Sequence, residues 1–429
     1  YCAALGLVYF LRGRGLGRLA SYGAGLLLAF SGYWLTLFSA GHLGWFQWMT
    51  YGVFAFGLAD RALAGGRLRH WILLGAVLAW GSFYQPDLWL LFTVFTFAYF
   101  VFALVREKNG DGFWRRFASG SAAALAVFLA IGMPSFRNAL SEDLAGRDRQ
   151  IESGQTLGGA VPADDARWIF VTNWSLPPAE TLELLVPRLN GDTSCPFTLA
   201  LGRRGGRDVK PYTGALGRPL GAKSGNWRQH SLYAGLVTCV LAAIGLAAGF
   251  RRREVAFFAV CAFVFWLFSL GRNCETVYRI VYALPFGDYL RAPVKWLHLA
   301  EFCLAVLAAY GIEAASSLKG AKFMAPALAL AVLAGAADLA RVDRLYCAPQ
   351  DVKCEYTFVP RAQALAANAK IAGSVGDYAC VAVPRARPER GTPYAGGFTA
   401  KTAMFALSAL ATLFALALAA AGLFRGGRR

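Results

Sequence analysis

The chain of 429 residues is strongly apolar and carries a formal net charge of +18. Hydrophobic residues make up 57% of it, charged residues only 16%, and the mean hydropathy is +0.44, whereas about a quarter of a soluble domain is charged. The basic residues fall in short clusters between apolar runs, which argues against a soluble or nucleic-acid-binding protein and predicts an integral membrane protein.

Apolar runs follow one another along most of the chain, and we predict that each is helical because a backbone in lipid must satisfy its own hydrogen bonds. In chain order the runs cover residues 1–11, 19–39, 45–63, 71–84, 86–105, 118–134, 231–250, 255–271, 295–314, 322–340 and 402–424. The first run begins at Tyr1, so we expect part of the protein to precede it. The fold class that follows is an all-α polytopic membrane protein with ten or eleven transmembrane helices.

The connectors between these runs alternate between two kinds. One kind is short and basic, which is typical of cytoplasmic loops; it contains Arg12–Arg18, Arg67–Arg69, Arg106–Arg116, Arg251–Arg253, Lys319–Lys322 and Arg425–Arg429. The long loops 135–229, 272–294 and 341–400 are then predicted to lie on the outer side of the membrane. We expect this membrane to be a bacterial cytoplasmic (inner) membrane. The chain thus divides into transmembrane regions 1–134 and 230–340, outer lobes 135–229 and 341–400, and a last helix with a basic tail at 401–429.

The two longest outer loops are predicted to fold into small lobes. Within 341–400, the stretches Glu355–Val359 and Tyr378–Val383 resemble strands, and Arg361–Ala372 resembles a helix. We therefore expect a small α+β lobe there.

The segment Phe286–His298 holds the first candidate site. Arg291 and Lys295 lie where an outer loop enters a span, and Pro293 suits the first turn of the helix that follows. Two basic residues at the outer membrane interface have two explanations. They either bind the anionic headgroup of a substrate, or their aliphatic stems lie in the membrane while their charged ends contact lipid phosphates. His298 and Glu301 follow at helical spacing. Ionisable groups at this depth are costly and face a polar cavity or a partner, so the cluster either belongs to a site or joins helices.

The second candidate site lies in two short outer turns that connect neighbouring helical hairpins. His42 falls in the first turn, and Gln85 and Asp87 fall in the second. Asp87 suits a general base or a ligand for a divalent cation, and the alternative is that it caps the helix after it. At the cytoplasmic end, Asp60 and Arg61 are expected to pair with each other. The sequence contains no phosphate-binding loop and no metal-ligand motif, so it establishes no cofactor and leaves a divalent cation at Asp87 open.

Several stretches resemble the bacterial YfhO-like membrane proteins of the GT-C superfamily of glycosyltransferases. They occur in the family's order: Ser31–Gly32, Gly41–Leu43, Asn173–Glu180, Leu185–Gly191, Trp227–Tyr233, Tyr289–Lys295 and Leu307–Gly311. The resemblance implies a GT-C-like fold and an enzyme that transfers a sugar from a polyprenyl-phosphate donor at the outer leaflet to a cell-envelope glycan or polymer. It also implies an essential acid in a loop before Tyr1, and it places Lys295 where the family usually has a second arginine.

These features together predict a membrane glycosyltransferase with Asp87 as the catalytic residue of this chain. Arg291, Lys295, His298, Glu301, His42 and Gln85 are predicted to bind the substrate or its lipid phosphate. The expected partners are the lipid-linked donor, the glycan acceptor and membrane lipids. Two other functions stay open, namely a transporter or flippase of lipid-linked glycans and a non-catalytic membrane scaffold.

Overall fold

A computed structural model describes residues 2–33, 43–65, 67–83, 86–107, 112–138, 163–185, 216, 232–316, 354–360, 371–375 and 378–384. The apolar runs within these residues all form helices, which confirms their predicted secondary structure. They are α1 (Cys2–Gly13), α2 (Arg18–Ala29), α4 (Leu43–Leu63), α5 (Leu68–Gly81), α6 (Pro86–Glu107), α7 (Phe113–Asn138), α11 (Leu236–Gly249), α12 (Arg253–Ser269) and α14 (Trp296–Ser316). The predicted spans at 322–340 and 402–424 lie outside the described residues.

Short helical segments connect the long ones. They are α9 (Ala163–Val171), α13 (Glu275–Tyr282) and the 3-10 turns η2 (Pro178–Leu184), η3 (Gly271–Cys274), η4 (Gly287–Tyr289) and η5 (Pro293–Lys295). Pro293 occupies the first turn of η5, which continues directly into α14. The predicted helix start at this proline is therefore confirmed.

Within the described residues, three helices are both long and apolar enough to cross a membrane. They are Asp87–Glu107, Phe113–Asn138 and Pro293–Ser316, and a fourth results if Arg253–Ser269 and Gly271–Tyr282, which meet at a 111° bend, form one broken span. Helices such as α1, with 12 residues, extend only about 18 Å, less than the hydrocarbon thickness of about 30 Å. The chain is thus a helical, multi-pass membrane protein, and its described residues contain three to four candidate spans. The larger number of ten or eleven stays a prediction.

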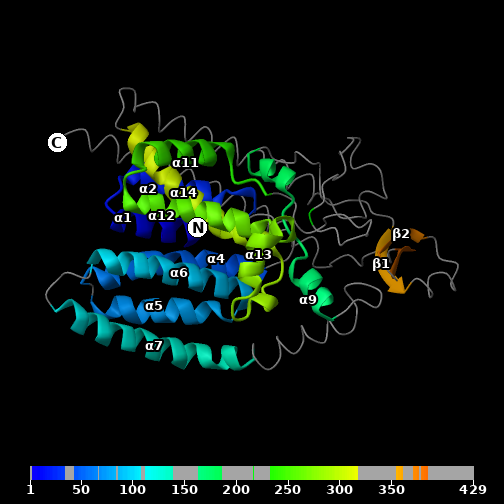
Figure 1. Cartoon of the computed structure of the whole chain (residues 1–429), viewed down its shortest axis with the longest axis horizontal. Helices are drawn as coiled ribbons and strands as arrows, with labels where there is room; N and C mark the ends of the chain where they lie inside the picture. Colours follow the sequence, from blue (N-terminus) through cyan, green and yellow to red (C-terminus); the bar gives the residue numbers. More distant parts are fainter. Residues whose placement is uncertain are drawn as a thin grey trace, which may run out of the picture.

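The long helices lie side by side with α14 in the interior and α7 at the edge (Figure 1). In the most apolar stretch of α14, 78% of the residues are buried, against 11% in α7. Helices α2, α11 and α12 make the most extensive contacts with α14, whereas α7 packs mainly on α5. The helix that carries Lys295, His298 and Glu301 is therefore shielded by protein, as intramembrane ionisable residues require.

Helices α11 and α14 approach each other so closely that glycine is required at their crossing. A Cβ atom on Gly311 would overlap the carbonyl oxygen of Leu241, and one on Gly245 would overlap that of Leu307. Small residues at such crossings allow backbones to pack tightly in a membrane protein. The two glycines therefore set the position of α11 against α14.

Aromatic side chains fill the centre of the bundle. Phe56 of α4 packs on Phe302 of α14, with ring centroids 4.7 Å apart, and on Phe95 of α6 at 5.0 Å. Phe10 of α1 contacts Tyr99 of α6 edge-on at 5.4 Å. This apolar layer joins four helices and separates the polar residues at the two ends of the bundle.

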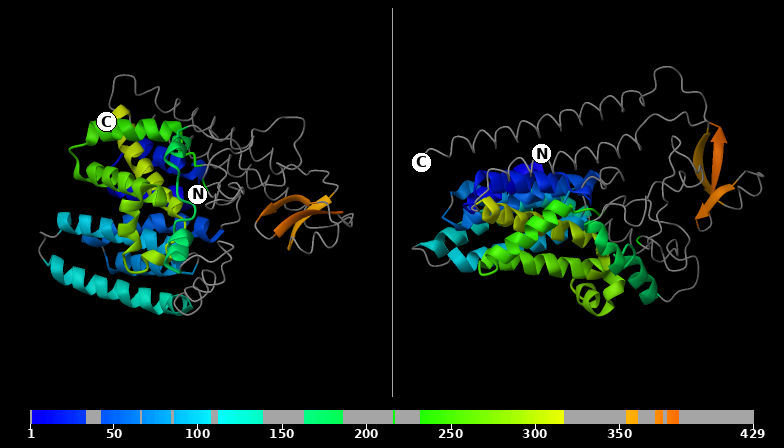
Figure 2. Two further views of the ribbon diagram at one scale, coloured as in Figure 1. Left: turned by 45° about the vertical axis from the view of Figure 1, so that its right-hand side comes forward. Right: turned by 90° about the horizontal axis from the view of Figure 1, so that it is seen from above.

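Segments α9 and α13 belong to two different predicted outer loops, and both lie at one end of the bundle (Figure 1). Figure 2 shows this end from two further directions. The arrangement agrees with loops that share one side of a membrane. The side that this end faces, like the identity of the membrane, stays a prediction.

Three strands form a small antiparallel sheet in the order β1-β3-β2. They are β1 (Cys354–Pro360), β2 (Ile371–Val375) and β3 (Tyr378–Pro384). The strand-like stretches expected at 355–359 and 378–383 fall within β1 and β3. Ile371 and Ala372, which were expected to end a helix, belong to β2, which has a β-branched residue at each end, Ile371 and Val375.

Candidate functional site

The turn that leads into α14 has an unusual backbone that neighbouring segments hold in place. Ala292 has a φ of 65°, which is uncommon for a residue with a side chain. Its amide donates to the carbonyl of Val171 at 3.0 Å, and the amide of Val294 donates to that of Trp174 at 3.1 Å. The Tyr33 hydroxyl donates to the carbonyl of Val294 at 3.0 Å. These bonds fix the position of the predicted site residues around the turn.

Lys295 forms a buried ion pair with Asp87, a residue 208 positions away in sequence. The two side chains are only 6% and 3% exposed. Asp87 lies in the first turn of α6, and its Oδ1 accepts a hydrogen bond from the amide of Leu88 at 2.8 Å. The two candidate sites that the sequence treats separately therefore meet through this pair. Asp87 therefore also contacts the first turn of α6.

His298 and Glu301 face the segment that follows α2. The His298 ring stacks on Tyr33, with centroids 3.9 Å apart and an interplanar angle of 6°. Glu301 accepts a hydrogen bond from the Ser31 hydroxyl at 2.6 Å. All four side chains are buried. The cluster therefore joins α14 to the chain after α2, which agrees with the helix-joining alternative for these two residues.

Arg291 is the predicted site residue that lies nearest the surface among those described. It is half-buried, and its guanidinium lies over the Phe170 ring at 4.7 Å. Arg167, on the same short helix as Phe170, pairs with Asp288 at 2.8 Å. Arg291 thus lies at an aromatic and charged rim, where a planar guanidinium can donate two parallel hydrogen bonds to a phosphate.

His42 and Gln85 lie outside the described residues. Among the side chains that are described, no group of three His, Cys, Asp or Glu residues is placed to hold a metal ion. A role for a divalent cation at Asp87 therefore has no support from a ligand cluster in this part of the chain.

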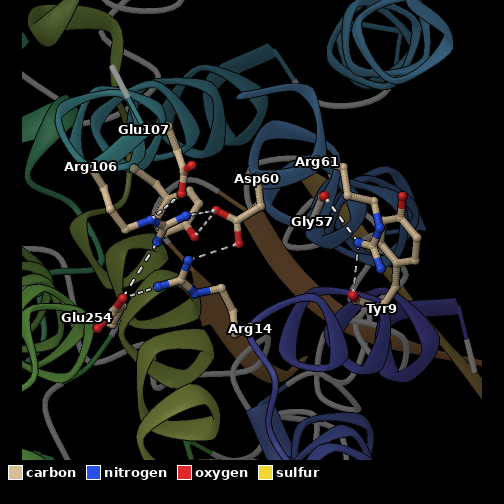
Figure 3. Close-up of polar contacts among 9 residues, drawn as sticks. Tyr9, Arg14, Gly57, Asp60, Arg61, Arg106, Glu107 and Glu254 are labelled. Atoms are coloured by element: carbon tan, nitrogen blue, oxygen red, sulfur yellow. Dashed lines mark hydrogen bonds and ion pairs between the residues drawn. The ribbon is translucent and has the colours of Figure 1, made fainter. Parts of the chain in front are cut away.

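A second polar cluster lies at the opposite end of the bundle (Figure 3). Asp60 of α4 accepts a hydrogen bond from the Tyr99 hydroxyl at 2.7 Å and pairs with Arg106 at 3.3 Å and Arg14 at 3.6 Å. Arg14 also pairs with Glu254 of α12. The cluster therefore joins α4, α6 and α12 to the α1–α2 connector, and it brings together three of the predicted cytoplasmic loops.

The expected pairing of Asp60 with Arg61 is wrong. Arg61 points away from the cluster (Figure 3), places its guanidinium 3.5 Å from the centroid of the Tyr9 ring, and donates to the carbonyls of Tyr9 and Gly57. Adjacent residues on a helix project about 100° apart, so they do not face each other. The predictions from the sequence did not include Glu254. As an acid directly after three arginines, it was the sequence signal for this cluster.

The two clusters are separated by the length of one membrane span. Asp87 and Arg106 lie at opposite ends of α6, 19 residues apart, and a rise of about 1.5 Å per residue separates them by about 28 Å. The hydrocarbon core of a bilayer is about 30 Å thick. Helix α6 therefore has the dimensions of a transmembrane helix with polar anchors at both interfaces.

No protein-family model matches the chain, no curated protein matches it, and no solved structure matches it. The resemblance noted in the sequence is therefore not supported by these comparisons. The fold and the two polar clusters are those of a helical, multi-pass membrane protein, with three to four candidate spans in the part of the chain that the structure describes.

Proposed function

We propose that this protein is a glycosyltransferase that uses a polyprenyl-phosphate-linked sugar at the outer leaflet of a bacterial cytoplasmic membrane. The acceptor would be a cell-envelope glycan or polymer. The observation that carries the proposal is the buried ion pair between Asp87 and Lys295. Lys295 follows the half-buried Arg291 by four residues. A carboxylate and two cations at one end of a membrane-length helix suit the headgroup of a lipid-linked sugar.

The chemistry assigns a role to each of these groups. The acceptor hydroxyl attacks the anomeric carbon, the bond from that carbon to the phosphate oxygen breaks, and the electron pair leaves with the polyprenyl phosphate. A base must take the hydroxyl proton, and Asp87 is the candidate for this role within this chain. Arg291 would stabilise the charge that develops on the leaving phosphate, while Lys295 positions Asp87.

The resemblance to GT-C enzymes adds a second source of the base, because it implies an acid in a loop before Tyr1. Under that arrangement Asp87 and Lys295 support the turn that carries Arg291, and Arg291 keeps its role at the phosphate. Arg291 is therefore the residue on which the proposal is best tested.

The experiment measures sugar transfer from a radiolabelled polyprenyl-phosphate donor by the full-length protein in membranes. We expect Arg291→Ala to reduce transfer by roughly 100-fold or more, the usual effect of losing one group that stabilises developing charge. The matched control is Arg279→Ala, because this arginine is 59% exposed and forms its ion pair within one turn of α13. Membrane insertion should be unchanged in both variants.

Normal transfer by Arg291→Ala would remove Arg291 from the site. Movement of the donor between leaflets without cleavage of the sugar–phosphate bond would instead indicate a transporter or flippase. If neither cleavage nor movement occurs with the complete protein, the enzyme proposal is wrong and a scaffold function is favoured.

A further inference from the structure

We propose that Glu301 is a proton-binding site inside the helix bundle, where the carboxyl group carries its proton at neutral pH and reacts with apolar carbodiimides. The inference does not depend on the proposed glycosyltransferase activity. It rests on the burial of Glu301, on its hydrogen bonds and on the groups around it.

Glu301 has the environment of a neutral acid. Its side chain is 2% exposed, and its Oε2 accepts one hydrogen bond from Ser31. Its Oε1 has no hydrogen-bond partner among the described residues. An ionised carboxylate in such a place costs several kcal/mol unless a cation and several hydrogen bonds compensate for the lost water. One hydroxyl group does not supply this compensation.

Among the described residues, the elements packed around Glu301 present mainly uncharged groups. The nearest cation on its own helix segment, Lys295, pairs with Asp87 and lies six residues earlier, about 9 Å along the axis. His298 stacks on Tyr33. The polar or titratable groups that face this region are Ser31 and Tyr33 after α2, Cys239 of α11, Cys261 of α12, and His298 and Cys303 of α14. Helices α1, α4 and α6 contribute Phe10, Phe56 and Phe95 to the core next to α14.

Three other acids of the bundle differ from Glu301 in having cationic partners. Asp87 pairs with Lys295, Asp60 with Arg14 and Arg106, and Glu254 with Arg14. These pairs favour the ionised form of each acid. These three ion-paired acids can therefore be compared with Glu301 in one protein, with a reagent that reacts with protonated carboxyl groups in an apolar environment.

Dicyclohexylcarbodiimide is such a reagent. The carboxyl proton moves to one nitrogen of the reagent, and the carboxyl oxygen forms a bond to its central carbon, which gives an O-acylisourea. Where water is excluded, the acyl group then migrates to nitrogen and forms a stable N-acylurea. No atom is lost and no further reactant is needed, so the product is the sum of Glu301 and the reagent.

The test treats the full-length protein in detergent micelles with dicyclohexylcarbodiimide at neutral pH and locates the adduct by peptide mass spectrometry. We expect modification of Glu301 to exceed that of Asp60, Asp87 and Glu254 by roughly tenfold or more, because only a protonated carboxyl starts the reaction. Glu301→Gln should remove the adduct. Glu313→Gln, a change on the same helix, should leave it in place.

A second measurement remains useful if Glu301→Gln does not fold. The wild-type protein should show the infrared C=O stretch of a buried protonated carboxyl at neutral pH, and Glu313→Gln should retain it. The proposal is overturned if wild-type Glu301 stays unmodified while the ion-paired acids react, or if this infrared band is missing. Equal modification of all four acids would also overturn it.

Discussion

Removal of the Lys295 ammonium is expected to destabilise the protein strongly, because it leaves the Asp87 charge inside the bundle without that counter-ion. The two side chains are 6% and 3% exposed, so little water can replace the lost partner. Breaking a buried ion pair by removing one member costs about 3–5 kcal/mol. We therefore expect Lys295→Met, which keeps the length of the apolar stem, to lower the free energy of unfolding by about this amount.

A double-mutant cycle separates the pair from the packing of its members. Asp87→Asn combined with Lys295→Met removes both charges, so the double variant should be more stable than Lys295→Met alone by about 1–3 kcal/mol. Reversible unfolding in mixed micelles supplies the four free energies. Arg279→Met serves as the control, since its pair with Glu275 is exposed at 59% and 55% and should contribute only about 0.3–0.5 kcal/mol.

Two results would refute this reasoning. The first is a cost of Lys295→Met no larger than that of Arg279→Met. The second is strict additivity of the changes at Asp87 and Lys295, which would mean that the two groups do not interact in the protein. Either result would also remove the structural link between the two candidate sites.

Two further predictions concern the rest of the bundle. Gly311→Val should weaken the packing of α11 on α14, because a Cβ at this position overlaps the carbonyl oxygen of Leu241; overpacking costs about 1–3 kcal/mol, and the midpoint of thermal unfolding in detergent should fall. Asp60→Asn should destabilise the opposite end of the bundle by about 1–3 kcal/mol, because Arg14 and Arg106 lose a shared carboxylate. Faster proteolysis at the α1–α2 connector should accompany that change, and an unchanged digestion rate would contradict it.

The sequence determined the helical character of the chain and the positions of its apolar helices. Runs of apolar residues must form helices in lipid, because no water is present to satisfy the backbone. Helices α6 and α14 follow the predicted runs closely, whereas α7 extends beyond its predicted run at both ends. The helix start at Pro293 was also predictable, since it depends on the local chemistry of proline. The number of spans stays a prediction, because the length of an apolar run does not fix the length of the helix that crosses the membrane.

Only the tertiary structure decided which polar residues meet. Asp87 and Lys295 are 208 residues apart, and no local pattern relates their positions. Asp60 and Arg61 are adjacent, yet a helix directs them to different neighbours, so that Asp60 contacts Arg14 and Arg106 while Arg61 covers Tyr9. Periodicity along a helix determines which side chains share a face, but the packing of α14 among α2, α11 and α12 determines what each face contacts.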